Sequence, residues 1–245
     1  MFPIQDNMPR RCPPVMTWFI IGVNAFVFFL ENGLSTFALD YFISIFGVVP
    51  ARFTQPGWAE FHGVPSIGYL SLITCMFLHG GWLHIILNMW TLWIFGDNVE
   101  DVMGPWRFLA FYMLTGIAAS LLHLFANPDS TIPIIGASGA IAGVMGAYYT
   151  LFPGARIIMM IPIFFFPFLF EVPAVLFLAL WFLLQMVSGT LSIVDPLHAG
   201  GIAWWAHVGG FIAGAVLNRL FIPGGRQRTC RRYADEYRPW GIYIK

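Results

Sequence analysis

Apolar positions fill most of this chain, and they fall in long runs rather than in the spaced stripe of a soluble helix. A bilayer core of roughly 30 Å needs about 20 mostly apolar residues in one helix. Such runs cover residues 15–31, 69–96, 106–126, 137–152, 157–188 and 201–222. Strands of a membrane barrel would alternate in polarity over about ten residues, and no such alternation is visible. The pattern therefore predicts six membrane-spanning helices, because a helix satisfies its own backbone groups in lipid.

Turn-forming residues separate these runs. Gly, Pro, Asn or Asp occurs at residues 31–33, 104–105, 127–129, 153–154, 195–196 and 223–224, where such residues end helices. We therefore expect an all-α, polytopic membrane protein in three parts. A cytoplasmic segment covers residues 1–14, a six-helix membrane domain covers residues 15–222, and a basic cytoplasmic tail covers residues 223–245.

Composition agrees with lipid as the solvent of this chain. Hydrophobic residues make up 58% and charged residues only 10% of its 245 positions, and the mean hydropathy is +0.75. That much apolar surface exceeds what a soluble core of this length can bury. The formal net charge is zero, so nucleic-acid binding gains no support, and the expected partner is the lipid bilayer.

The basic residues predict the orientation of the helices. Cytoplasmic loops of membrane proteins carry an excess of Lys and Arg. With six spans, eleven of the twelve basic residues fall on one side, and only Arg52 falls on the other. This distribution predicts that both termini are cytoplasmic. It also suits a bacterial inner membrane, which is the location we expect.

The fourth run suggests a buried reactive group. From Ser138 to Phe152 there are fourteen steps, or roughly 21 Å of helix, which is too short to cross the bilayer. Ser138 would then lie about 10 Å below the outer surface, where water must reach it. His207 stands fifteen steps before Ile222, which gives it a similar depth. An intramembrane histidine is costly and is a functional candidate by default, so the two residues predict a serine–histidine dyad.

Small residues accompany both members of this pair. Gly139 and Gly143 follow the serine, while Gly210 and Gly214 follow the histidine, each pair at helical spacing. Small residues let two membrane helices approach closely. Taken alone, the glycines fit helix packing without any chemistry.

The second run carries further polar groups. His84 and Asn88 are i, i+4 neighbours and project from one helix face. Acyl transfer needs donors aimed at the developing oxyanion, and these two side chains can supply them together with the backbone N–H of Ser138. His79 and Glu100 are expected to be structural: His79 braces the loop before the helix, and Glu100 holds the turn after it. No Asp, Glu or Cys lies in register with the histidines, so we expect neither a metal site nor a cofactor.

Three motifs occur in a fixed order along these runs. They are His84-x-x-x-Asn88, Gly136-x-Ser138-Gly139 and Ala206-His207-x-x-Gly210-x-x-x-Gly214. In this order on six spans, the motifs resemble the rhomboid family of intramembrane serine proteases. The resemblance implies that Ser138 is the nucleophile, that His207 is the general base and acid, and that His84, Asn88 and the Ser138 amide stabilise the oxyanion. It also implies that the substrates are transmembrane proteins, cut in or near a membrane-spanning segment.

One position departs from the family pattern. Many members carry an aromatic residue four positions after the serine, where it can stack on the histidine, whereas this chain has Ala142. The group that orients His207 is therefore open, with Tyr148, Tyr149 and Trp205 as candidates. Two other functions stay open as well: a non-catalytic rhomboid-like protein that binds transmembrane clients, and a small transporter or channel lined by the same polar residues.

Overall fold

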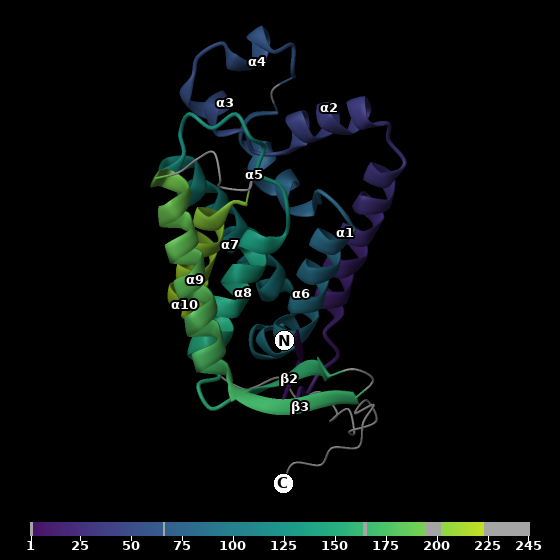
Figure 1. Ribbon diagram of the computed structural model, residues 1–245, viewed down its shortest axis with the longest axis vertical. Coiled ribbons are helices and arrows are strands. Elements are labelled where there is room, and N and C mark those ends of the chain that lie inside the picture. Colours follow the sequence, from purple (N-terminus) through teal and green to yellow (C-terminus); the bar gives the residue numbers. More distant parts are fainter. Residues whose placement is uncertain (1, 66, 164–165, 195–201, 223–245) are drawn as a thin grey trace.

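The structure is a bundle of long helices with a small sheet at one end and short helices at the other (Figure 1). This computed structural model describes residues 2–65, 67–163, 166–194 and 202–222. The predicted basic tail, residues 223–245, lies outside the described residues. The long helices are α1 Val15–Asn32, α6 Trp82–Met103, α7 Pro105–Ala126, α8 Ser138–Leu151, α9 Ala174–Val194 and α10 Trp204–Phe221.

One long helix overlaps each of the six apolar runs, but fewer of them qualify as spans. Within the described residues, three helices are long and apolar enough to cross a membrane: Val15–Asn32, Pro105–Ala126 and Ala174–Ile193. A fourth span results if Gly68–Phe77 and Trp82–Met103, which meet at an angle of 84°, are counted together. The chain is therefore an integral membrane protein, and the count of six spans stays a prediction.

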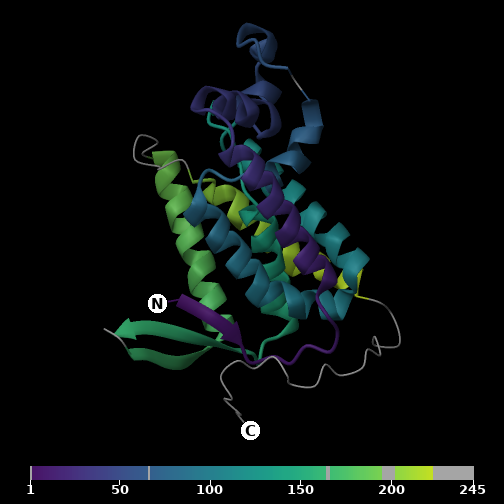
Figure 2. The ribbon, with the colours of Figure 1, turned by 90° about the vertical axis from the view of Figure 1, so that its right-hand side faces the viewer.

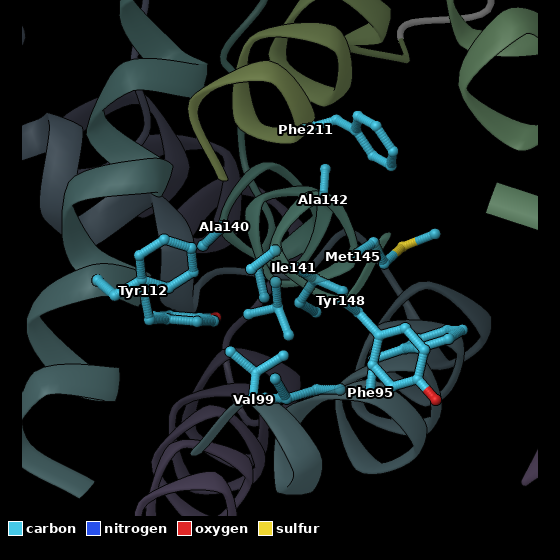
Figure 3. Close-up of a cluster of buried hydrophobic side chains, with 14 of the residues drawn as sticks. Phe95, Val99, Tyr112, Ala140, Ile141, Ala142, Met145, Tyr148 and Phe211 are labelled. Atoms are coloured by element: carbon cyan, nitrogen blue, oxygen red, sulfur yellow. The ribbon is translucent and has the colours of Figure 1, made fainter. Parts of the chain in front are cut away.

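The short helix α8 occupies the centre of the bundle, with α7 on one side and α10 on another (Figure 1). The apolar side chains around it come from several helices (Figure 3). Phe95 of α6 is buried against Tyr148 of α8, with the ring centroids 5.0 Å apart. Tyr112 of α7 is fully buried on another side of α8, and Phe211 of α10 lies near Ala142. This packing surrounds α8 with protein, which fixes the position of Ser138 at its first residue.

Glycines allow α8 and α10 to touch through their backbones. A methyl group added to Gly210 would overlap the carbonyl of Gly139, and one added to Gly214 would overlap the carbonyl of Gly143. A methyl group on Gly143 itself would overlap Thr115 of α7. Such close approach is what small residues permit between membrane helices.

Only the second half of the fifth run is helical. Its first half forms a hairpin of β2 Arg156–Ile163 and β3 Phe166–Pro173, and α9 begins only at Ala174. Prolines are the physical reason, because Pro162 and Pro167 lack an N–H and cannot sit inside a regular helix. A further strand, β1 Phe2–Asp6, pairs antiparallel with β2 and completes a sheet in the order β1-β2-β3 (Figure 2). The chain is thus mostly helical rather than all-α.

The remaining elements follow α1 and precede α6 in the chain. Three of them, α2, α3 and α4, lie at the end of the bundle opposite the sheet (Figure 1). They are α2 Thr36–Phe46, α3 Pro50–Thr54, α4 Trp58–Phe61, η1 Gly68–Leu70, α5 Ser71–Thr74 and η2 Cys75–Phe77. Helix α2 begins at an N-cap serine, because Ser35 Oγ accepts the N–H of Ala38 at 3.4 Å.

At the turn that follows α6, Glu100 acts through its backbone carbonyl, which accepts the N–H of Gly104 at 2.7 Å, while its side chain bonds elsewhere. Its carboxylate accepts the backbone N–H groups of Met16 at 2.9 Å and Thr17 at 2.8 Å, and the hydroxyl of Thr17 at 2.8 Å. The first N–H groups of a helix have no partner within the helix, and a negative charge there is favourable. Glu100 therefore caps the start of α1, which begins after Pro14 and has no capping side chain of its own.

Candidate active site

The loop that precedes α8 is held in place by backbone hydrogen bonds. Ile134 pairs with Val48 in an isolated antiparallel bridge, and the N–H of Gly136 donates to the carbonyl of Cys75 at 2.9 Å. Gly136 has φ of 118°, a conformation that residues with a Cβ rarely adopt. The loop thus turns sharply just before Ser138, whose N–H belongs to the first turn of α8 and has no acceptor within the helix.

The predicted serine and histidine meet. Ser138 Oγ and His207 Nε2 are 2.8 Å apart, although 69 residues separate them in the chain. Both stand in the first turn of their helices, since α8 begins at Ser138 and α10 at Trp204. A hydroxyl at this distance from a ring nitrogen can pass its proton to that nitrogen, which is the first requirement of an activated nucleophile.

His207 has a second partner that the sequence did not reveal. Its Nδ1 lies 2.8 Å from Oε1 of Gln185 on α9. The aromatic candidates for this role are engaged elsewhere: Tyr148 donates its hydroxyl to Asp6, Trp205 donates to the carbonyl of Gly189 at 3.1 Å, and Tyr149 packs on Phe211. One signal was present, because Gln185 is a long amide side chain in the middle of an apolar run.

The rings of two tryptophans flank the same imidazole. Trp181 has its ring centroid 5.9 Å from that of His207, with the planes tilted by 36°. Trp204 lies 6.2 Å away and meets His207 edge-on, at 88°. These are contact distances for aromatic pairs, so α9 and α10 both limit the rotation of the histidine.

His84 and Asn88 converge on the loop before Ser138. A Cβ atom built on Gly136 would lie 2.8 Å from His84 Nε2 and 3.8 Å from Asn88 Nδ2. The backbone N–H of Gly80 donates to His84 Nδ1 at 3.4 Å. Because Nδ1 is then the acceptor, the neutral ring carries its proton on Nε2, the atom that faces Gly136. Asn88 Nδ2 is buried and has no hydrogen-bond partner within the described residues. Two donors therefore lie beside the start of α8.

His79 lies behind these donors. Its backbone N–H donates to both carboxylate oxygens of Glu31, at 3.1 and 3.3 Å, and its ring meets the ring of His84 at a centroid distance of 5.1 Å. Glu31 is buried at the end of α1, and sequence reasoning had assigned it only to a turn. The backbone of His79 thus ties the loop that precedes α6 to α1. Both nitrogens of its buried ring have no hydrogen-bond partner within the described residues, so a bracing role for the side chain stays a prediction.

Nothing in the described part of the chain forms a metal centre, since no three His, Cys, Asp or Glu side chains cluster there. A cavity of about 10 Å³ borders Ser138, which is room for about one water molecule. Its lining includes Gly136, Ala203 and Ala206. The arrangement offers a hydroxyl, an imidazole and several N–H donors in one place, which is the equipment of acyl transfer.

Comparison with known proteins matches the family model described as the Rhomboid domain to residues 68–224. Rhomboid protein 1, mitochondrial, of Saccharomyces cerevisiae is 32% identical over 60% of this chain and 40% of its own length. RHOMBOID-like protein 5 of Arabidopsis thaliana is 32% identical over 62% of this chain and 43% of its own length. Rhomboid protease GluP of Bacillus subtilis is 32% identical over 55% of this chain and 24% of its own length. This chain thus spans less than half the length of these relatives. Mitochondrial and plant proteins stand among them, so the predicted bacterial inner membrane gains no support.

Proposed function

This chain belongs to the rhomboid family, and on that premise we propose that it is a serine endopeptidase that cuts other membrane proteins in or near a transmembrane segment. The observation that carries this proposal is the 2.8 Å contact between Ser138 Oγ and His207 Nε2. It is supported by the name of Rhomboid protease GluP, one of the relatives.

The proposed reaction begins at the serine hydroxyl. His207 Nε2 takes the proton from Ser138 Oγ as the oxygen attacks the carbonyl carbon of the scissile peptide. The imidazolium then gives this proton to the leaving amine, and an acyl-enzyme remains on Ser138. A water molecule, deprotonated by His207, releases the acyl group and restores the hydroxyl.

The negative charge that develops on the carbonyl oxygen needs donors already in place. In this proposal the donors are His84 Nε2–H, Asn88 Nδ2–H and the backbone N–H of Ser138. Their support is geometric: the first two converge beside Gly136, and the third belongs to the first turn of α8. A preorganised donor of this kind typically contributes about 3 kcal/mol to the transition state.

The substrate class follows from the surroundings of the dyad. Helix α8 has only 14 residues, so a site at its first residue would lie within the depth of the membrane rather than at its surface. A substrate helix hides its carbonyls in hydrogen bonds and must unwind locally before attack. We therefore expect cleavage near small or helix-weakening residues.

We also propose an orientation in the membrane, with the sheet and both termini on the cytoplasmic side. With six spans, eleven of the twelve basic residues fall on that side.

Covalent labelling tests the proposal. Purified protein in detergent is treated with a fluorescent fluorophosphonate, which reacts with activated serines. The native chain should be labelled, while Ser138→Ala and His207→Ala should not. Ser120→Ala is the matched control, because Ser120 is also buried but its hydroxyl contacts Cys75 Sγ instead of a histidine. This control should be labelled like the native chain.

Cleavage of a membrane substrate completes the test. A single-span protein with a small-residue segment is reconstituted with the chain in liposomes, and the products are identified by mass spectrometry. Cuts within the span that vanish in Ser138→Ala support the proposal. A folded native chain that is neither labelled nor active, yet binds the span, would contradict it and favour the non-catalytic client-binding alternative.

A further inference from the structure

The amide of Gln185 is held at both ends. Its Nε2 donates to the backbone carbonyl of Trp181, one turn earlier on α9, at 3.4 Å, and its Oε1 lies 2.8 Å from His207 Nδ1. A backbone carbonyl can only accept a hydrogen bond, so the NH₂ group of the amide must face Trp181. The oxygen must therefore face the histidine.

The orientation of the amide decides where the imidazole carries its proton. The amide oxygen is an acceptor, so Nδ1 of His207 must be the protonated nitrogen. In a neutral ring, Nε2 then holds a free lone pair, and this nitrogen faces Ser138 Oγ at 2.8 Å. Three hydrogen bonds in series thus run from a helix carbonyl to the serine hydroxyl. The opposite tautomer would place two acceptors, Nδ1 and Oε1, against each other at Gln185, and its Nε2–H would donate to Ser138 Oγ instead of accepting the serine proton.

The surroundings of Gln185 argue against a role in simple helix packing. The side chain is only 7% exposed, while Leu183 and Leu184 beside it on α9 are 56% and 62% exposed. Burying an amide in an apolar region is costly unless its groups are bonded. Other polar residues of α9 bond within their own helix: Thr190 donates to Met186 at 2.9 Å and Ser192 donates to Gly189 at 2.8 Å. Gln185 makes such a bond and, in addition, reaches α10.

We propose that Gln185 is a positioning residue, whose carbonyl oxygen holds His207 in the tautomer that can take the proton from Ser138. This inference rests on the proposed function, since it concerns how the same dyad is kept ready. A dyad without a carboxylate needs some acceptor at Nδ1, and α9 supplies a neutral one. A neutral acceptor fixes the ring without placing a charge in the apolar interior.

Two substitutions at Gln185 separate positioning from packing. Gln185→Met keeps the length and volume of the side chain but offers only a weak acceptor. Gln185→Glu keeps a carbonyl oxygen for His207, and its protonated form can still donate to Trp181. We expect the fluorophosphonate labelling rate to fall about tenfold or more in Gln185→Met, because a buried N–H loses its partner. In Gln185→Glu the rate should stay within about threefold of the native rate.

The matched control is Thr190→Val on the same helix. It removes a hydrogen bond to the helix carbonyl one turn earlier, as Gln185→Met does, but this bond does not involve the dyad. Its labelling rate should equal the native rate. If Gln185→Met does not fold, Gln185→Leu takes its place, and the thermal unfolding of each variant is recorded beside its rate.

Nitrogen NMR of protein that is isotope-labelled at its histidine rings shows directly which ring nitrogen of His207 carries the proton. The His207 signals are identified by their loss in His207→Ala. In the native chain Nδ1 should show the shift of a protonated ring nitrogen and Nε2 that of an unprotonated one. In Gln185→Met the two tautomers should mix, and in Gln185→Glu the native pattern should return.

The outcomes distinguish this inference from the proposed function. A native chain that is not labelled at all overturns the proposed function, and the tautomer can still be read by NMR. A labelled native chain whose rate and ring signals are unchanged in Gln185→Met overturns the positioning role alone. Equal losses in Gln185→Met and Gln185→Glu, with native ring signals in both, would also overturn it, because packing would then explain the effect.

Discussion

The two ends of α6 differ in how far their buried polar side chains are hydrogen-bonded. At the end nearer Ser138, Asn88 Nδ2 is buried and has no partner within the described residues. At the other end, Asn98 Nδ2 donates to Asp6 at 2.8 Å and to Asp97 at 3.1 Å, and Glu100 accepts three hydrogen bonds. A buried donor without a partner is unfavourable. In the proposed mechanism, the oxyanion of the transition state provides the missing acceptor.

Helix α8 repeats the contrast. Ser138 at its start shares a single hydrogen bond with an imidazole, which can accept the proton. Tyr148, near its end, donates its hydroxyl to Asp6 of β1. Asp6 therefore joins β1 to both α6 and α8. One end of the bundle thus leaves a buried donor without a partner, while at the other end Asn98 and Tyr148 bond to Asp6 and attach the N-terminal segment.

The largest effect on activity should come from removing the unpaired donor. Asn88→Ala should lower the rate of proteolysis about 100-fold or more, because an oxyanion donor is lost, while thermal stability changes little. The measurement is turnover of the liposome substrate beside the unfolding temperature.

Asn98→Ala is the matched change at the other end of α6. Asn98 is also buried, but it bonds Asp6 rather than a substrate. We expect this variant to lose stability, by about 1 kcal/mol, and to keep its rate at temperatures where it is folded. The reverse result, with Asn98→Ala slow and Asn88→Ala merely unstable, would overturn the contrast between the ends.

The middle of the bundle should respond to added volume with a loss of stability. Gly214→Ala places a methyl group against the backbone of Gly143, and we expect a loss of about 1–3 kcal/mol from overpacking. The control is Gly22→Ala on α1, where an added Cβ meets nothing within 4 Å. That change should stabilise α1 slightly, because Ala is the better helix former. Thermal unfolding in detergent measures both, and equal effects would contradict the packing argument.

Glu100 should matter for the start of α1 and not for chemistry. In Glu100→Gln one acceptor oxygen and the negative charge are lost at a helix N-terminus, which should cost about 1–2 kcal/mol. The exposed Glu60 of α4 provides the control Glu60→Gln, which should be neutral. Hydrogen exchange of the first turn of α1 is the measurement. A fall in labelling rate without faster exchange would show that Glu100 acts on the site instead.

Much of the helical layout was readable from the sequence, because apolar length and turn residues are local signals. The hairpin β2–β3 was not, since an apolar run of 157–188 satisfies the length of a span and gives no sign of strand alternation. Its prolines argued against a regular helix but did not reveal a strand partner. Pairing with β1 joins Phe2 to Met160, and no local pattern predicts contacts across such a separation.

At the candidate site, too, the sequence predicted some contacts and missed others. The sequence could predict that Ser138 and His207 lie at the same depth in the membrane, because both depths were counted from the predicted cytoplasmic ends of their helices. Gln185 could not be assigned to His207, because its role depends on how α9 faces α10, and apolar residues surround it along the chain. The side-chain partners of Glu100 were missed for a similar reason, because Met16 and Thr17 lie 84 and 83 residues away in the chain.

The smallest expected effect is a pH dependence in the stability of β1, at the end of the bundle that carries the sheet. Burial raises the pKa of Asp6 from 3.8 to about 7, with the nearby Asp97 acting in the same direction and the hydrogen bond from Tyr148 opposing it. A carboxyl whose pKa is higher in the folded state holds more protons there than in the unfolded chain. Its contribution to the docking of β1 is therefore full below pH 4 and is lost as pH rises toward 7.

Asp6→Asn isolates this effect, because the amide is uncharged at every pH and its oxygen can still accept from Tyr148 and Asn98. At pH 5 the amides of β1 should exchange hydrogen at similar rates in the variant and the native chain. At pH 8 the native chain must keep a buried carboxylate, so its β1 amides should exchange several times faster than those of the variant. Comparing the two proteins at each pH removes the intrinsic pH dependence of exchange. The labelling rate of Ser138 should be the same in both, because Asp6 contacts Tyr148 near the far end of α8. A ratio of exchange rates that does not change between pH 5 and pH 8 would mean that the carboxyl of Asp6 is ionised throughout this range, and that the sheet end of the bundle tolerates a charge that we expect it to exclude.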